Sequence, residues 1–406
     1  MKMRRAAAIV GFAALAQGAS AQDFSAHGYL DCRLIVRTEE TSWADGALGK
    51  TRFGGNGASA ACVQAAIVGT AQLTPALLAL ADVQYQTTDH NSFSVLEAYL
   101  RYRPVSTTPL RWSVKVGEFF PPVSLENDAI GWTNPWTITP SAINSWIGEE
   151  IRAIGAEGRL EWRGDAQSIE GILAVVRSND PAGELIAARG WALSDLTSGI
   201  GSLVREPDVY AADNDAPIPL RFNPFLENDG KVGWYAGADW NAPGRGQITV
   251  LRYDNEADPS THSNGVSPVY SWRTEFWSFG AEAYVGDVVL IGQAMTGSTD
   301  IVPSPFFSSS TDFRSAYLLA AWNRGAWRPA VRLDYFSTDE FPSSPGDRVR
   351  EHGNALTVAL NWRPRDWLRL TAEVLHVYSW RNQRLEEGIE SGQTDNQLQV
   401  NARLMF

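Results

Sequence analysis

Polar and apolar residues alternate one by one along most of this chain. The clearest case is Gln397–Phe406, where every even position is apolar and the odd positions up to Arg403 are polar. A period of two places successive side chains on opposite faces of a β-strand. Each such segment therefore predicts a strand with one apolar and one polar face.

The alternation recurs in sixteen segments. They lie near 27–36, 60–72, 76–86, 92–104, 110–119, 149–162, 167–178, 230–241, 245–254, 270–285, 287–297, 312–323, 325–337, 352–363, 366–379 and 394–406. The connections after the even-numbered segments are tight. Those after the odd-numbered segments are long, at 37–59, 120–148, 179–229, 255–269, 298–311, 338–351 and 380–393, except for the short 87–91.

This layout predicts an all-β fold, a transmembrane antiparallel up-and-down β-barrel of about sixteen strands, with short periplasmic turns and long extracellular loops. Tryptophans near the tight turns, such as Trp112, Trp240 and Trp362, match an interfacial girdle. A soluble all-β exoprotein is the alternative, since soluble sandwiches also alternate.

The first residues predict export. Lys2, Arg4 and Arg5 precede the apolar run 6–16, and Ala19–Ala21 follows as an A-x-A cleavage pattern. This arrangement is typical of a secretory signal peptide over residues 1–21, because the run is shorter than a spanning helix; a membrane anchor is the alternative. The mature barrel, residues 22–406, is then expected in the outer membrane of a bacterial cell.

Composition excludes several classes of protein. With 44% hydrophobic and 11% aromatic residues the chain is not disordered, and a net charge of −12 argues against nucleic-acid binding. Two cysteines cannot staple 406 residues. Moreover, Cys32 falls on the apolar face of its segment and Cys62 shares a face with Gln64, so no disulfide is expected.

The sequence predicts no enzyme, no cofactor and no dedicated metal site. It contains neither a G-x-S-x-G elbow nor an H-E-x-x-H motif. His376 faces outward near the external end of its segment, where a barrel phospholipase would hold its base, but we expect an interfacial role for it. The acidic segment 180–229 could hold Ca²⁺ or Mg²⁺ that bridges lipopolysaccharide phosphates, or attract cations to the mouth.

An exported chain that ends in an alternating strand with a C-terminal aromatic, Phe406, resembles the Gram-negative outer-membrane porins. The strand count is similar to that of the general and phosphate-selective porins, and Trp43–Gly54 resembles a segment of porin-like proteins. The resemblance implies that Phe406 is an assembly signal read by the barrel-assembly machinery. In phosphate-selective porins basic residues of the third external loop bind the anion, but here 120–148 contains no Lys or Arg, so phosphate selectivity is not carried over.

Charged side chains on the polar faces are the candidate pore lining. They form two basic groups, one on 92–104 and 110–119 and one on the last four segments. The first comprises Arg101, Arg103, Arg111 and Lys115, and the second comprises Arg328, Arg332, Arg363, Arg369 and Arg403.

The loop 120–148 is the candidate constriction. We expect its Glu126 and Asp128 to face Arg101, Arg111 and Lys115 and so to complete an eyelet. Two alternatives stay open: the wall charges only solvate a wet interior, or the aromatic loop caps the mouth.

These features predict a porin, a passive diffusion channel for small hydrophilic solutes or ions. A transporter of apolar molecules and a barrel enzyme of phospholipase type are the alternatives. Expected partners are outer-membrane lipid and lipopolysaccharide. Small outward residues predict a homotrimer packed on the first three segments; they are Gly28, Ala61, Ala65, Gly69, Ala79 and Ala81.

Overall fold

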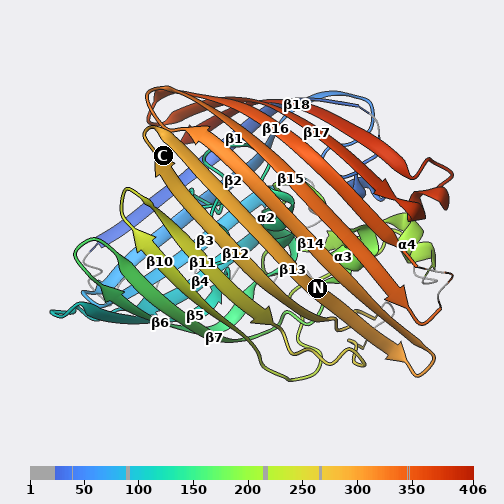
Figure 1. Ribbon diagram of the computed structural model, residues 1–406, viewed down its shortest axis with the longest axis horizontal. Coiled ribbons are helices and arrows are strands. Elements are labelled where there is room, and N and C mark those ends of the chain that lie inside the picture. The colour runs from blue at the N-terminus through green and yellow to red at the C-terminus, as the bar shows by residue number, and fades with distance from the viewer. Residues whose placement is uncertain are drawn as a thin grey trace, which may run out of the picture.

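The computed structural model describes residues 23–38, 40–87, 92–213, 218–264, 268–344, 346 and 348–406, so the predicted signal peptide lies outside the described residues. Sixteen antiparallel strands close into a barrel, in which β1 pairs with β18 (Figure 1). The predicted fold class is confirmed. The strands are β1 (Asp23–Thr38), β2 (Gly57–Thr74), β3 (Leu77–Gln86), β4 (Phe93–Tyr102), β5 (Leu110–Phe119), β6 (Ala153–Arg163), β7 (Ser168–Arg177), β10 (Gly233–Ala242), β11 (Gly246–Asp254), β12 (Arg273–Val285), β13 (Val288–Ser304), β14 (Phe307–Trp322), β15 (Trp327–Pro342), β16 (Arg350–Arg365), β17 (Leu368–Arg381) and β18 (Gly392–Met405).

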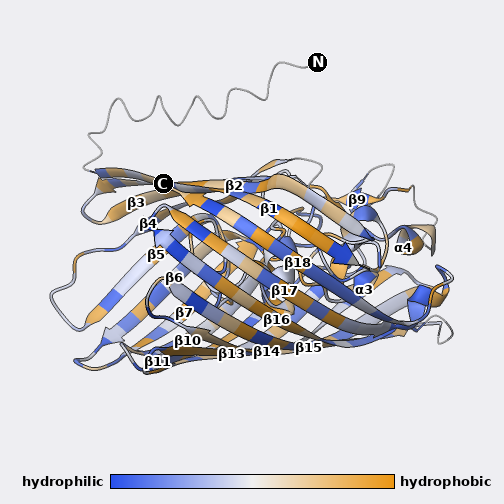
Figure 2. Ribbon diagram, turned by 90° about the horizontal axis from the view of Figure 1, so that it is seen from above, coloured by the Kyte–Doolittle hydropathy of each residue, from blue (hydrophilic) through white to orange (hydrophobic). Residues whose placement is uncertain are grey.

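The alternation of the sequence places apolar side chains on the outside of the barrel. On β16, Leu356, Val358 and Leu360 are 39–47% exposed, whereas the intervening Thr357 and Ala359 are at most 1% exposed. Figure 2 shows the same alternation of hydrophobic and hydrophilic residues along the strands. An apolar outside on a closed sheet suits a bilayer, where every backbone group must be paired within the protein. Among the described residues, no helix is long and apolar enough to cross a membrane.

The long connections gather at one mouth of the barrel and the tight turns at the other. The long ones include residues 39–56 (L1), 120–152 (L3) and 178–232 (L4), which separate β1 from β2, β5 from β6 and β7 from β10. The predicted long loop 298–311 is wrong, because β13 and β14 extend through it and leave a two-residue hairpin turn. Both strands are therefore longer than the alternating segments 287–297 and 312–323 predict.

A bulge in β2 changes the predicted orientation of two residues. Asp31 pairs with Gln64 but Cys32 pairs with Cys62, so Val63 is an extra residue in β2. One extra residue exchanges the two faces of a strand. Cys62 therefore faces outward as Cys32 does, and the two form a disulfide, which corrects the expectation of unpaired thiols. The same shift moves Ala61 off the predicted trimer face.

The C-terminal residue completes the seam of the barrel. The backbone N–H groups of Gly28 and Phe406 each donate to the other residue's carbonyl oxygen, at 3.0 Å in both directions. A β-carbon at position 28 would lie 2.4 Å from the carbonyl oxygen of Ala66 and 2.5 Å from Cζ of Phe406, so glycine allows both β2 and the aromatic ring to approach β1. The terminal ring is thereby part of the closure of the sheet.

Candidate functional site

L3 folds into the barrel and crosses to the far wall. Its helix α2 (Ala142–Glu150) is buried at every residue, and the Ser141 side chain caps it by accepting the N–H of Asn144. The Trp146 ring contacts Phe276 and Phe313, on β12 and β14, at centroid distances of 5.6 and 5.0 Å. Figure 1 shows α2 within the ring of strands. The apolar side of α2 therefore packs on inward-facing side chains of the wall opposite β5.

Arg332 of β15 is the main anchor of L3. Its guanidinium donates to the carbonyl oxygens of Thr139 and Pro140 at 2.7 and 2.9 Å, and it pairs with Asp334 at 2.8 Å and with Glu126 at 3.5 Å. Arg332 and Glu126 are both completely buried. Of the predicted pore-lining residues, these two therefore lie in the packed contact between the loop and the wall.

Glu126 ties the loop to itself as well. Its carboxylate accepts the backbone N–H of Ser141 at 2.7 Å and the side-chain amides of Asn134 and Asn144 at 2.8 Å. The expectation that Glu126 pairs with the basic residues of β4 and β5 to complete an eyelet is wrong. Glu126 pairs with Arg332 rather than with the β5 cations, because the loop crosses the lumen before it turns.

The remaining arginines of the second basic group follow the same stretch of loop. Arg363 and Arg369 both donate to the carbonyl oxygen of Pro135 at 3.2 Å, and Arg403 donates to the Thr133 hydroxyl at 2.9 Å. Arg403 also pairs with Asp31 at 2.6 Å. Arg328 lies nearer the tight turns, where it donates to the carbonyl oxygen of Gly325 at 3.2 Å. The arginines of this wall therefore bind L3 mainly by donating to carbonyl and hydroxyl oxygens of the loop.

The first basic group stays on its own side of the lumen. Lys115 pairs with Glu157 of the adjacent β6 at 3.1 Å and lies over the Phe119 ring, and Arg103 approaches Glu161 at 3.9 Å. Arg101 and Arg111 are half-buried on the inward faces of β4 and β5. This side of the wall is thus wetter than the opposite one.

Asp128 of L3 points toward the tight-turn half of the lumen. Asp128 is exposed. Partial desolvation raises its pKa, as does the nearby carboxylate of Glu282, while Arg363 opposes the shift. Its charged neighbours are thus on β12 and β16, which differs from the position beside Lys115 that the sequence predicts.

L4 fills the outer half of the barrel together with L1. It contains α3 (Glu184–Arg189), α4 (Asp208–Asp213) and a small sheet of β8 (Val204–Arg205) and β9 (Arg221–Phe222). Glu351 of β16 accepts the Trp191 N–H at 2.9 Å and pairs with Lys50 of L1 at 2.5 Å. Burial lowers the pKa of Lys50 to about 8, although Glu351 opposes the shift. One wall carboxylate therefore ties two loops to the barrel.

The stretch of L4 from Ser194 to Ser198 lies between α2 and the β1–β3 wall. Asp195 pairs with Arg33 at 2.5 Å and with Arg52 of L1 at 3.1 Å. Burial by itself would raise the pKa of Asp195, but these two guanidinium groups outweigh it and hold the pKa below its usual value. On the other side, the Ser194 N–H donates to the Ser145 hydroxyl at 2.9 Å. We call residues 194–198 the latch segment.

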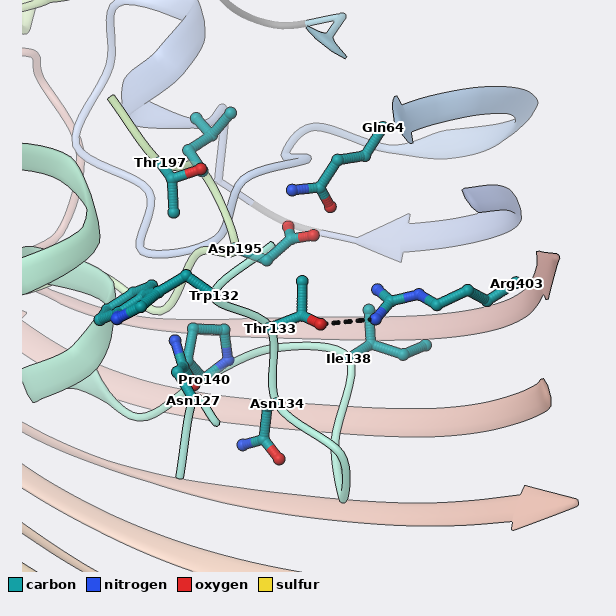
Figure 3. Close-up of a pocket in the computed structure, with 11 residues that line it drawn as sticks. Gln64, Asn127, Trp132, Thr133, Asn134, Ile138, Pro140, Asp195, Thr197 and Arg403 are labelled. Atoms are coloured by element: carbon teal, nitrogen blue, oxygen red, sulfur yellow. Dashed lines mark hydrogen bonds between the residues drawn. The ribbon is translucent and has the colours of Figure 1, made fainter. Parts of the chain in front are cut away.

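Two cavities adjoin the latch segment. The inner one has a volume of about 10 Å³ and lies between L3, L4, β2 and β18, where Thr133, Asp195 and Arg403 line it (Figure 3). The outer one, of about 40 Å³, is lined by L1, α2 and L4 residues. Since a single water needs about 10–15 Å³, neither admits a solute without movement of the loops.

The sequence did not single out this contact. Arg52 lies inside the Trp43–Gly54 segment and Asp195 inside the acidic fourth loop, but nothing in their spacing pairs them. Their contact brings together two loops, because Arg52 and Asp195 are 143 residues apart in the chain.

The fold is shared with solved outer-membrane proteins. No protein-family model matches the chain, and neither does any curated protein sequence. The anion-selective porin from Comamonas acidovorans is similar with a TM-score of 0.52 at 11% identity, over 95% of this chain and 99% of that one. The outer membrane channel DcaP of Acinetobacter baumannii gives 0.50 at 11% identity, over 95% and 97%.

A loop L8 deletion mutant of OmpT, an outer membrane protein of Vibrio cholerae, gives a TM-score of 0.51 at 9% identity, over 95% of this chain and 99% of that one. At these identities the similarity shows the fold alone. The chain thus has the sixteen-stranded porin-like barrel fold.

Proposed function

We propose that this chain is an outer-membrane porin, a passive diffusion channel for small hydrophilic solutes or ions. The observation that carries the proposal is the charged inner wall on the tight-turn side of the latch segment. There Arg101 and Arg111 are half-buried and Arg103 is exposed, within a barrel whose outside is apolar. Ionisable side chains within a membrane protein are tolerated where water reaches them, and such hydrated charges mark the path of ions or solutes.

The surroundings of the barrel support an outer-membrane location. The apolar outer face suits lipid, and lipopolysaccharide is its expected neighbour at the loop side. The pairing of Phe406 with Gly28 is compatible with recognition of the last strand by the barrel-assembly machinery. Ala65 and Gly69, opposite Leu30 and Ala26 on β1, keep a flat outer surface on which a homotrimer can pack.

A channel is favoured over a barrel enzyme by the hydrogen-bond partner of His376. The imidazole faces outward, where a barrel phospholipase would hold its base, but the side chain it contacts is the Asn396 amide, at 2.7 Å, rather than a hydroxyl nucleophile. A catalytic base needs its nucleophile within hydrogen-bond reach. This contact instead suits a side chain that stabilises the outer surface.

The test is single-channel recording of the purified chain in planar bilayers, with reversal potentials in a tenfold KCl gradient. We expect current steps from the wild type. Exchange of both Arg101 and Arg111 for Gln should shift the reversal potential toward cations. The matched control is Arg324→Gln with Arg365→Gln, which removes the same charge at the exposed turns.

Two results would contradict the proposal. The absence of current steps in repeated reconstitutions would reject the channel. Equal reversal potentials for the two double variants would show that Arg101 and Arg111 do not border the ion path.

A further inference from the structure

The latch segment is the partition between the two cavities. Leu196 and Thr197 line both the inner and the outer cavity. Thr197 is held on the wall by Gln84 and Gln86 of β3, at 2.7 Å and 2.5 Å from its hydroxyl. Displacement of these two residues would join the two cavities.

The two ends of this partition are held by different chemistry. Thr197 makes neutral hydrogen bonds to glutamine side chains, and water can replace those at little cost. Asp195 instead neutralises two guanidinium groups, of Arg33 and Arg52, that are each only 2% exposed. Water cannot replace a counter-ion in a buried site.

The charge balance around Asp195 makes its removal costly. Arg33, Arg52 and Arg403 contribute three positive charges, whereas Asp31 and Asp195 contribute two negative ones. The net charge of these five side chains is +1. If Asp195 moved away, it would rise to +2, because only Asp31 would remain to offset the three arginines. A larger buried excess of positive charge costs free energy and so favours the entry of another anion.

We propose that Arg33 and Arg52 form a carboxylate-binding site that Asp195 occupies in this structure, and that a carboxylate solute entering the site releases the latch segment. The inference rests on the proposed channel function. The loop carboxylate acts as an internal stand-in for the solute. Exchange of one carboxylate for another keeps the net charge around the two arginines unchanged, whereas opening without a solute raises it by one.

The planar carboxylate of Asp195 indicates the class of solute. One of its oxygens lies 2.5 Å from Arg33 and the other 3.1 Å from Arg52. The site therefore accepts a carboxylate whose two oxygens each bind one guanidinium group. A tetrahedral phosphate is not planar, so it matches this two-oxygen geometry less closely than a carboxylate does. We therefore expect a small carboxylate to be preferred over inorganic phosphate.

The first experiment measures binding without requiring conduction. Succinate and inorganic phosphate are titrated calorimetrically into the refolded full chain, as wild type, Asp195→Asn and the control Asp208→Asn. Asp208 is another L4 carboxylate, paired with Arg205 at 2.9 Å outside the latch segment. Asp195→Asn should bind succinate about tenfold more tightly than wild type, because the competing loop carboxylate is gone. Asp208→Asn should bind as wild type does.

The second experiment records single channels at constant ionic strength. Succinate on the loop side should raise the open probability of wild type, and Asp195→Asn should open without it. Arg52→Gln should lose the response to succinate. Equal succinate affinity in wild type and Asp195→Asn, or equal binding of phosphate and succinate, would overturn the proposed site.

The two proposals fail in different ways. If no variant conducts but Asp195→Asn still binds succinate more tightly, the channel function is rejected and the carboxylate site stands. If wild type conducts and its open probability equals that of Asp195→Asn, the latch is rejected and the channel stands.

Discussion

Replacement of Arg332 by methionine should release L3 from the barrel wall. The guanidinium is completely buried and touches Glu126, Asp334 and the carbonyl oxygens of Thr139 and Pro140. Methionine has a similar length and no charge. The variant therefore leaves two buried carboxylates without their shared cation.

The magnitude follows from that loss. Removal of one partner from a buried ion pair costs about 3–5 kcal/mol, because the other charge remains uncompensated. The loop can relieve the penalty by leaving the wall and taking Glu126 into water. A change of about 3 kcal/mol in the free energy of loop opening raises the open population about 100-fold.

Limited proteolysis measures that population. L3 carries no Lys or Arg between 120 and 148, so trypsin has no cleavage site in this stretch. Chymotrypsin can cut it after Trp132 and Trp136. When reclosure is faster than cleavage, the cutting rate is proportional to the open fraction. Arg332→Met should be cut about 100-fold faster than wild type, with the barrel still folded on cold electrophoresis.

Arg328→Met is the matched control, since Arg328 is four residues away on the same face of β15 and donates to Gly325 rather than to L3. Addition of Glu126→Gln to Arg332→Met should restore part of the protection, because one unpaired carboxylate is removed. Cleavage of Arg332→Met at the wild-type rate would refute the view that this arginine holds the loop.

Three further outcomes follow from other contacts. Gly28→Ala should reduce the folded fraction on cold electrophoresis, because its β-carbon would lie 2.4 Å from the backbone oxygen of Ala66 and 2.5 Å from the terminal aromatic ring, whereas Gly69→Ala has 3.9 Å of clearance and should fold normally. Exchange of both Cys32 and Cys62 for serine should lower the free energy of unfolding in urea by about 3–4 kcal/mol, since the bridge closes a loop of 30 residues; an unchanged midpoint would contradict this. Burial raises the pKa of Glu150 from its ordinary 4.5 to about 8, so its stabilising contribution is complete below about pH 4.5 and is lost as the pH rises through 8. The melting temperature of wild type should therefore fall more from pH 5 to pH 9 than that of Glu150→Gln, and parallel curves would reject the shift.

The barrel could be predicted because its cause is local and repeated. Each strand must show one face to lipid and one to the lumen, so the alternation reports the fold at every strand. The disulfide could not be predicted by the same rule. Val63 is an extra residue in β2, and nothing in its sequence context marks the bulge that moves Cys62 onto the face of Cys32.

The contacts of the loops were harder to predict, because the residues that the loops bind are distant from them in the chain. Nearness along the sequence suggested that Glu126 pairs with Lys115, but the loop carries Glu126 across the lumen to Arg332. One local signal was available for α2. Ser141 precedes the helix as a cap, whereas the alternating pattern assigned its last two residues, Glu149 and Glu150, to a strand.

Burial separates the two basic groups that look equivalent in the sequence. Arg332 and Arg369 are at most 4% exposed, and their N–H groups are directed at fixed oxygens of L3. A guanidinium in that position is engaged by L3, so an anion reaches it only if the loop moves. Arg101 and Arg111 keep contact with water, where a counter-ion can exchange quickly. Ion selectivity should therefore follow substitutions on β4 and β5, whereas substitutions at Arg332 and Arg369 should change how firmly L3 is held.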